Sequence, residues 1–191
     1  MSVVLFNGFE LLDVFGPLEV LSMVPERFTV SLVGPSVGPV TSSQGAAVLA
    51  NQSQSQAAAP DIVLVPGGAG TRQLVRDTQW LRWLREWASQ ASLITSVCTG
   101  AALLAAAGLL NGYRATTNNH HFAWVSAFGA DTAWQPGARW VHDRDRWTSA
   151  GISAGIDMTL ALVGELCGSG VAENVAARME YDWPGLPPIN H

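Results

Sequence analysis

Cys98 is the residue of this chain best placed for nucleophilic chemistry. It follows the apolar run Ala91–Val97, which has the length of a buried strand, and it precedes Thr99, Gly100 and an alanine-rich helical stretch. A strand, a sharp turn and a helix in this order form a nucleophile elbow, which presents a reactive side chain at the turn. The helix N-terminus beside the sulfur favours the thiolate, so we expect a thiol pKa below the ordinary value of about 8.5. The alternative is a buried cysteine that only fills space in the core.

Asp13 is the candidate proton donor. It lies in the apolar segment Leu12–Pro17, just after the first predicted strand. A carboxylate at a strand–helix junction often caps the helix, and this N-cap interpretation is favoured for Asp13 taken alone. If Asp13 reaches Cys98 instead, burial beside a thiolate would raise the pKa of the carboxyl and let it donate a proton. We expect Glu19, six residues later, to be an ordinary helix residue with an exposed carboxylate.

A glycine-rich turn is the candidate anion-binding element. The apolar run Asp61–Val65 ends in Pro66-Gly67-Gly68-Ala69-Gly70. Backbone amides of such a turn can point into a cleft and bind a developing negative charge. The glycines do not follow the dinucleotide-binding spacing, and the chain has no lysine to serve as the phosphate-binding lysine of a P-loop. The alternative is a tight turn without a ligand.

Histidines and a second cysteine complete the set of reactive side chains. His120 and His121 follow a polar segment and could assist Cys98, although adjacent histidines in a loop are more often surface groups. We expect His142, which is followed by Asp143, Arg144 and Asp145, to lie in a solvated hairpin turn. We expect Cys167, late in an apolar helix, to be a core residue. These residues form neither a metal-binding spacing nor a disulfide framework.

The elements that must position these residues alternate between strands and helices. The predicted strands are short apolar runs at Ser2–Phe6, Phe28–Val33, Asp61–Val65 and Ala91–Val97. The predicted helices lie at Leu11–Met23, Thr78–Ser89, Thr99–Leu110, Ser153–Cys167 and Gly170–Glu180, with Ser153 as the N-cap of its helix. This alternation predicts a doubly wound α/β fold, with a mostly parallel sheet covered by helices on both faces. Ligands bind such sheets beyond the carboxyl ends of the strands, where the candidate residues lie.

The remaining segments complete a single predicted domain over residues 1–191. The polar tract Gln52–Pro60 is expected to be a surface connection, and three prolines in Trp183–Pro188 prevent a regular helix there. The tryptophans at positions 80, 83 and 87 share helical spacing, which is typical of core packing or of a subunit interface.

Composition excludes several classes of protein. The 191 residues are 48% hydrophobic and only 13% charged, which is incompatible with intrinsic disorder. A net charge of −5 argues against a nucleic-acid-binding surface, and the absence of lysine excludes a lysine Schiff base. The longest apolar run, Ala101–Leu110, is about half of the roughly 20 residues that a membrane crossing needs. The N-terminal apolar stretch lacks the basic region of a signal peptide, so we expect a cytoplasmic protein with reduced thiols.

Motifs along nearly the whole chain resemble the ThiJ/PfpI family, part of the class I glutamine amidotransferase-like superfamily. They include Leu11-Leu12-Asp13, Gly16-Pro17, Pro66-Gly67-Gly68, Thr95-Ser96-Val97-Cys98-Thr99-Gly100, Arg114-Ala115-Thr116-Thr117 and the segment Thr148–Asp157. The resemblance implies a flavodoxin-like α/β fold and, as is common in the family, a homodimer.

Within the family, the residues at two positions point to one branch. Amidase, protease and deglycase branches usually carry His directly after the nucleophile and Glu at the early acid position, where this chain has Thr99 and Asp13. These two residues are similar to the isonitrile hydratase branch. One departure from that branch is Asn118, because hydratases tend to have His directly after the two threonines.

The resemblance to this branch implies a reaction, a set of site residues and a small-molecule substrate. Cys98 would attack the isonitrile carbon while Asp13 supplies a proton, giving a thioimidate that water converts into an N-substituted formamide. The backbone amides of Gly68 and Thr99 would stabilise developing charge, and the Thr99 hydroxyl would orient water or Asp13. Substrate-pocket candidates are Gly67, Ala69, His120 and His121. No metal or organic cofactor, nucleic acid or membrane is implied.

Two other functions fit the same motifs. The ligand-sensing half of AraC-type regulators shares many of them, so the chain could be a non-enzymatic ligand- or redox-sensing domain whose Cys98 is easily oxidised. We expect no DNA-binding helices, because the chain leaves no room for them. The third interpretation is a hydratase or deglycase acting on glyoxals, against which the missing His after Cys98 counts.

Overall fold

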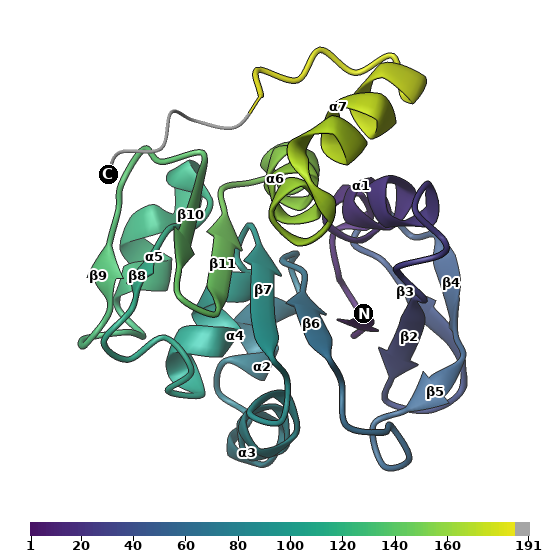
Figure 1. The fold of residues 1–191 in the computed structure, drawn as a ribbon. Helices are drawn as coiled ribbons and strands as arrows, with labels where there is room; N and C mark the ends of the chain where they lie inside the picture. Colours follow the sequence, from purple (N-terminus) through teal and green to yellow (C-terminus); the bar gives the residue numbers. More distant parts are fainter. Residues whose placement is uncertain (186–191) are drawn as a thin grey trace.

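The central element of the structure is a seven-stranded sheet with the strand order β10-β11-β7-β6-β1-β2-β5. A computed structural model describes residues 1–185 of the chain (Figure 1). All neighbouring strands of this sheet are parallel except β10, which pairs antiparallel with β11. The strands are β1 (Ser2–Val4), β2 (Ser31–Gly34), β5 (Gln52–Ser53), β6 (Ile62–Val65), β7 (Leu93–Val97), β10 (Trp140–Asp143) and β11 (Arg146–Ser149). Two small pairs lie outside it: β3 (Gly38–Thr41) with β4 (Ala47–Ala50), and β8 (Arg114–Ala115) with β9 (Ala133–Trp134).

Helices cover both faces of this sheet. Helices α1 (Leu11–Ser22), α6 (Ala154–Cys167) and α7 (Ser169–Arg178) pack together on one side (Figure 1). The other side carries α2 (Thr71–Leu74), α3 (Thr78–Ala88) and α4 (Gly100–Ala106), with the 3₁₀ turn η1 (Asn119–His121) and α5 (Phe122–Ser126) beside α4. The prediction of a doubly wound, mostly parallel α/β fold is therefore confirmed.

The strand order places a topological switch point between β1 and β6. The chain leaves β1 through α1 toward β2 on one side, and it leaves β6 through α2 and α3 toward β7 on the other. At such a point the connections diverge and open a crevice beyond the carboxyl ends of the strands. The segments that carry Asp13, Gly67 and Cys98 all begin at this edge.

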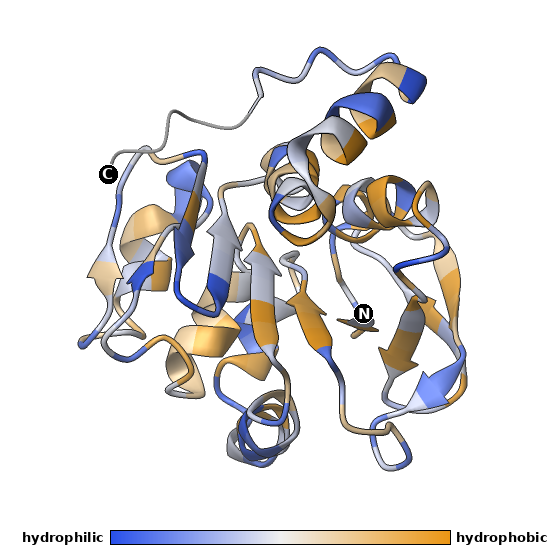
Figure 2. Cartoon of the chain, viewed as in Figure 1, coloured by the Kyte–Doolittle hydropathy of each residue, from blue (hydrophilic) through white to orange (hydrophobic). Residues whose placement is uncertain are grey.

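Burial of the sheet on both faces explains the low charge of the chain. All four residues of β6 are buried, as are four of the five residues of β7. In Figure 2 the strands β2 and β6 are mostly hydrophobic, whereas the edge strand β10 is hydrophilic. Strands without a solvent-facing side have no position at which a charged residue is tolerated.

Several boundaries differ from the predicted ones because short elements leave weak patterns. Helix α4 ends at Ala106 rather than Leu110, because Gly108 adopts a positive φ of 75° that terminates a right-handed helix. The tract Gln52–Pro60 is more than a surface connection, since its first two residues form the edge strand β5 and Ser53 is buried. The short strands β3, β4 and β8–β11 were not predicted. Of the tail, Trp183–Gly185 is irregular, and residues 186–188 lie outside the described residues.

The tryptophans of α3 belong to the core of the chain itself. Trp80 and Trp87 are buried, and the indole N–H of Trp87 donates to the carbonyl of Ala58 at 2.9 Å. Trp83 stacks on Trp87 and donates to the carbonyl of Gln54 at 3.2 Å. The helix therefore binds the 52–60 tract through Trp83 and Trp87, and the tryptophan spacing reflects packing within the chain.

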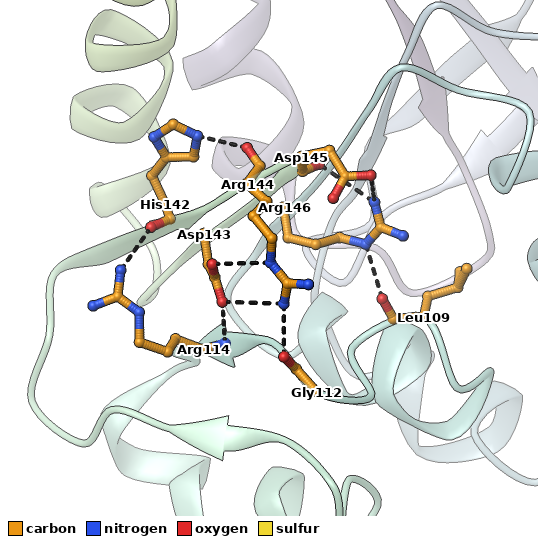
Figure 3. Close-up of polar contacts among 8 residues, drawn as sticks. All are labelled: Leu109, Gly112, Arg114, His142, Asp143, Arg144, Asp145 and Arg146. Atoms are coloured by element: carbon orange, nitrogen blue, oxygen red, sulfur yellow. Dashed lines mark hydrogen bonds and ion pairs between the residues drawn. The ribbon is translucent and has the colours of Figure 1, made fainter.

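The predicted hairpin turn lies at Arg144 and Asp145, between β10 and β11, but His142 is half-buried in strand β10 rather than in the turn. Its ring stacks on Trp147, and its Nε2 contacts the carbonyl of Arg144 at 2.7 Å. Asp143 pairs with Arg144 and accepts the backbone N–H of Arg114 at 2.7 Å (Figure 3). The charged groups of this hairpin therefore hold the turn onto β8, and they lie apart from Cys98.

Candidate active site

Cys98 lies in the sharp turn between β7 and α4, as the nucleophile-elbow pattern predicted. Its φ is +57°, in the left-handed region that residues other than glycine seldom occupy. Its backbone N–H donates to the Ser149 carbonyl at 3.1 Å, and its carbonyl accepts the Thr117 hydroxyl at 2.8 Å. These two bonds hold the strained backbone, so the sulfur is fixed at the carboxyl end of the sheet. The residue is only 6% exposed.

Asp13 is not the helix cap that its position alone favoured. Glu10 occupies the N-cap position of α1, and Asp13 is the third residue of the helix, with its side chain fully buried. Asp13 Oδ2 accepts the backbone N–H of Gly67 at 2.8 Å. Within residues 1–185, Oδ1 has no hydrogen-bond partner. The carboxyl thus faces the glycine turn and Cys98 instead of its own helix.

Burial keeps the Asp13 carboxyl protonated near neutral pH. Desolvation, with a smaller contribution from the charge of Glu10, raises its pKa to about 8 against the lowering effect of the Gly67 N–H. Because Oδ2 accepts from Gly67, the proton belongs on Oδ1, the oxygen left unengaged by the described residues. Asp13 therefore has the protonation state of a general acid.

The prediction of a lowered pKa for the Cys98 thiol is wrong. Burial, followed by the negative charge of Asp13, raises the thiol pKa to about 12. Hydrogen bonds from Asn118 Nδ2, 3.1 Å from the sulfur, and from Thr99 oppose this shift but do not overcome it. The N-terminus of α4, a helix of seven residues, is likewise outweighed by desolvation. At neutral pH the resting pair is a thiol beside a carboxylic acid.

Thr99 connects the elbow to the glycine turn. Its hydroxyl accepts the backbone N–H of Gly68 at 3.1 Å and lies 3.2 Å from the Thr71 hydroxyl. The Gly67 N–H donates to Asp13 and the Gly68 N–H donates to Thr99. The backbone amides of both glycines are therefore occupied by side chains of the site. The expectation that Gly68 offers a free N–H to an anion is therefore not met; the turn instead positions Asp13 and Thr99.

Two glycines allow this close packing. A Cβ on Gly67 would lie 2.6 Å from both the backbone nitrogen and the hydroxyl oxygen of Thr99, and 2.9 Å from Asp13 Oδ2. A Cβ on Gly151 would lie 2.7 Å from Cys98 Sγ. Real Cβ atoms do not approach other atoms this closely, so any other residue would displace the reactive groups.

A cavity of about 410 Å³ opens beside Cys98 and Thr99. Of the predicted pocket residues, Ala69 and His121 line it, together with Gly68. His120 does not line it; this side chain is exposed, and its backbone N–H donates to Asn118 Oδ1 at 2.9 Å. Gly67 is also absent from the lining and acts instead through Asp13.

Five further residues of the cavity wall were not among the predicted pocket residues. They are Glu10, Ser43, Arg72, Asn118 and Ile152. Of these five, Asn118 is marked by the sequence. It stands directly after the two threonines, where the resembled hydratases tend to have His. Arg72 lies in the four-residue helix α2 and Ser43 in a turn between strands; both segments are too short for a sequence period to mark them.

Cys167 and the remaining acidic groups add no second reactive centre. Cys167 is the last residue of α6 and is half-buried against a hydrophobic cluster, so the prediction of a core position is confirmed only in part. Within residues 1–185, no three His, Cys, Asp or Glu side chains gather closely enough to hold a metal ion. No helix of the same residues has both the length and the apolar character that crossing a membrane requires.

Comparisons with known proteins show which chains this one resembles. The chain is 40% identical over 181 residues to isonitrile hydratase of Pseudomonas putida, which covers 95% of this chain and 78% of that protein. It is 30% identical to the transcriptional regulator GbdR of Pseudomonas aeruginosa, of which it spans about half the length. A ThiJ/PfpI family protein of Pseudomonas syringae superposes with a TM-score of 0.85 at 32% identity, covering 100% of this chain and 77% of that one.

One family model matches most of the chain. The model of the DJ-1/PfpI family matches residues 1–165, from the first strand through Asp13 and Cys98 to most of α6. The chain therefore belongs to the DJ-1/PfpI family.

Proposed function

We propose that this protein is an isonitrile hydratase, which adds water to R–N≡C and releases an N-substituted formamide. The observation that carries the proposal is the buried pair of Cys98 and Asp13, in which the carboxyl retains a proton near neutral pH. An isonitrile carbon becomes electrophilic when it is protonated, so a neutral acid beside a nucleophile matches the demand of the reaction. The 40% identity to an isonitrile hydratase supports the same assignment.

The first half of the reaction forms a covalent intermediate. Asp13 transfers its Oδ1 proton to the isonitrile carbon, and Cys98 Sγ forms a bond to that carbon. The thiol proton passes to the Asp13 carboxylate, so the product is the thioimidate R–N=CH–S–Cys98 beside a carboxylic acid. A resting thiolate is unnecessary in this sequence, which agrees with the raised pKa of Cys98.

The second half releases the product. Water adds across the C=N bond to give R–NH–CH(OH)–S–Cys98, and loss of the sulfur with return of its proton leaves R–NH–CHO. Asn118 Nδ2, 3.1 Å from the sulfur, stabilises the negative charge that sulfur acquires as it departs. The Thr99 backbone N–H takes part in the same task, and the Thr99 hydroxyl orients the attacking water.

The direct test incubates the purified protein with cyclohexyl isocyanide and follows formation of the formamide by NMR. The wild type should produce N-cyclohexylformamide, and Cys98→Ala should not. Cys167→Ala is the matched control and should retain activity, because Cys167 lies at the far end of α6. Acid quenching should trap a Cys98 adduct heavier than the protein by the mass of one isonitrile. An active Cys98→Ala protein would refute the mechanism.

Ligand sensing is the second candidate, because the chain is 30% identical to the regulator GbdR. A sensing domain would bind a small molecule in the Cys98 cavity without releasing formamide, or would be modified at Cys98 by peroxide alone. A third arm of the assay, with methylglyoxal in place of the isonitrile, detects the glyoxal-directed activity. Turnover of the isonitrile alone identifies the hydratase.

We further propose that the protein acts as a homodimer in the cytoplasm. Leu12 and Phe15, three residues apart on α1, are 41% and 37% exposed, which is typical of a helix face that packs against a partner. A reducing compartment suits an enzyme that depends on a free thiol. Size-exclusion chromatography with light scattering measures the oligomeric state.

A further inference from the structure

The cavity beside Cys98 contains a positively charged group that the hydration chemistry does not use. Arg72, the second residue of α2, lines this cavity together with Cys98 and Thr99. We propose that Arg72, assisted by His121, binds a carboxylate of the substrate, so that the substrate class is isonitriles bearing a carboxylate group. This inference rests on the proposed hydratase function and adds to it the identity of the group at the other end of the substrate.

Two contacts hold the Arg72 guanidinium in place. Its central carbon lies 3.5 Å from the ring centroid of Trp124, a cation–π contact, and its terminal nitrogen lies 3.2 Å from His121 Nδ1. A guanidinium carries five N–H donors, of which the contact with His121 uses one. No carboxylate of residues 1–185 lies within 4.0 Å of Arg72. Arg72 is thus an oriented cation with most of its donors available, which suits bidentate binding of a carboxylate.

His121 provides a second donor on the same wall. Arginine is always protonated in proteins and has no acceptor, so it must donate in its contact with His121 Nδ1. A neutral imidazole that accepts at Nδ1 carries its proton on Nε2. Arg72 and His121 both line the cavity, so each side chain can contribute an N–H donor to an anion bound there.

Glu10 determines which end of such a substrate faces Asp13. Its carboxylate lines the cavity, accepts a hydrogen bond from Gln44 Nε2, and acts on Asp13 by its charge. A substrate carboxylate near Glu10 would be repelled, so the anionic end is directed to Arg72 and the uncharged isonitrile to Cys98. A cationic substrate bound by Glu10 is the opposing possibility, which the experiment must separate.

The experiment compares three small isonitriles that differ in charge: isocyanoacetate, its methyl ester, and 2-morpholinoethyl isocyanide. The wild type should hydrate the acid with a kcat/KM about tenfold or more above that of the ester, because a charge-assisted bidentate pair is lost in the ester. Equal rates for acid and ester, or preference for the morpholinoethyl compound, would overturn the inference while leaving the hydratase function intact.

Arg72→Met provides the matched variant, since methionine retains an unbranched stem against Trp124 and removes the charge. It should reduce the acid-to-ester ratio of kcat/KM to about one. Arg76→Met, which changes an exposed arginine four residues later, is the control and should keep the wild-type ratio. A wild-type ratio in Arg72→Met would overturn the role of Arg72.

A binding measurement separates failure of this inference from failure of the hydratase function. N-formylglycine is the product that hydration of isocyanoacetate would release, and its affinity can be measured by calorimetry without turnover. It should bind to Cys98→Ala about tenfold more tightly than its methyl ester, and the difference should disappear in Cys98→Ala/Arg72→Met. If none of the isonitriles is hydrated but this pattern holds, the hydratase proposal fails and the carboxylate site stands; equal affinities overturn the carboxylate site.

Discussion

At the scale of the residue, the site depends on how burial changes two acids. The Asp13 carboxyl and the Cys98 thiol both lose contact with water, and both pKa values rise as a result. The charge of one opposes the ionisation of the other, so protonation of Asp13 also removes one cause of the raised thiol pKa. The two groups therefore titrate as a coupled pair, and the neutral form is the one present near neutral pH.

The pH dependence of turnover tests this description. Asp13 acts as an acid only while it is protonated, so kcat/KM should be constant below a pH of about 8 and fall as the pH rises through that value. Asp13→Asn keeps the shape of the side chain but cannot donate the proton, and it should lower kcat by roughly 10²–10⁴-fold. The profile is measured with an uncharged isonitrile.

Glu19→Gln, at an exposed position of the same helix, is the control for this experiment and should match the wild type. A rate that rises through pH 8 to 9 would show that a free thiolate limits the reaction, and it would contradict the role of a protonated Asp13.

At the scale of the element, the turns after β6 and β7 are built against one another. Gly67 donates to Asp13, Gly68 donates to Thr99, and Thr99 follows the nucleophile directly. The glycine turn thus positions both the Asp13 carboxyl and the turn that carries Cys98. Its Gly67 and Gly68 amides are used for this and are not free to bind an anion. A change in either turn should disturb both reactive groups.

Gly67→Ala tests the fit between the two turns. The new Cβ would lie 2.6 Å from the backbone nitrogen of Thr99, so the elbow must move. We expect a loss of about 1–3 kcal/mol in the free energy of unfolding, measured with urea, together with most of the activity. Gly170→Ala, in α7 with open space around the added Cβ, is the matched control and should be neutral or slightly stabilising. Equal effects of the two substitutions would show that the turns tolerate displacement.

At the scale of the whole molecule, an ion pair with one buried partner connects distant segments to helix α6. Asp157, in the first turn of α6, is buried and pairs with Arg139, and its Oδ1 accepts the Tyr181 hydroxyl at 3.1 Å. Arg139 precedes β10, and Tyr181 follows α7. The network therefore joins the hairpin side of the sheet, the start of α6 and the end of α7.

Asp157→Ala should lower the free energy of unfolding by about 1–3 kcal/mol, because it removes the carboxylate that accepts hydrogen bonds from both Arg139 and Tyr181. The effect stays below that of a fully buried pair, since the Arg139 side chain is 51% exposed and can be solvated. Urea unfolding followed by tryptophan fluorescence provides the measurement. Glu19→Ala, exposed on α1, should change the stability by no more than about 0.5 kcal/mol. An equally small change for Asp157→Ala would contradict the structural role of the network.

The amino-acid pattern determined the architecture and two members of the site. Apolar runs such as Ile62–Val65 carry the signal of a sheet buried on both faces, because a buried strand tolerates no charge. The strand–Cys98–helix order determined the elbow, and Asp13 stood out as a carboxylate in an apolar segment. These signals are local, since each depends on neighbours in the sequence and on the periodicity of one element.

Tertiary structure alone decided the protonation of the site and the walls of its cavity. The pKa values of Asp13 and Cys98 follow from burial, which depends on segments distant in the chain, and they reversed the expectation of an activated thiolate. Asn118 reaches the cavity from a loop and Arg72 from the four-residue helix α2, and neither segment is long enough to show a period in the sequence. Sequence therefore specifies which groups exist and which element carries each, whereas their charge state and mutual distances arise only when the sheet brings the loops together.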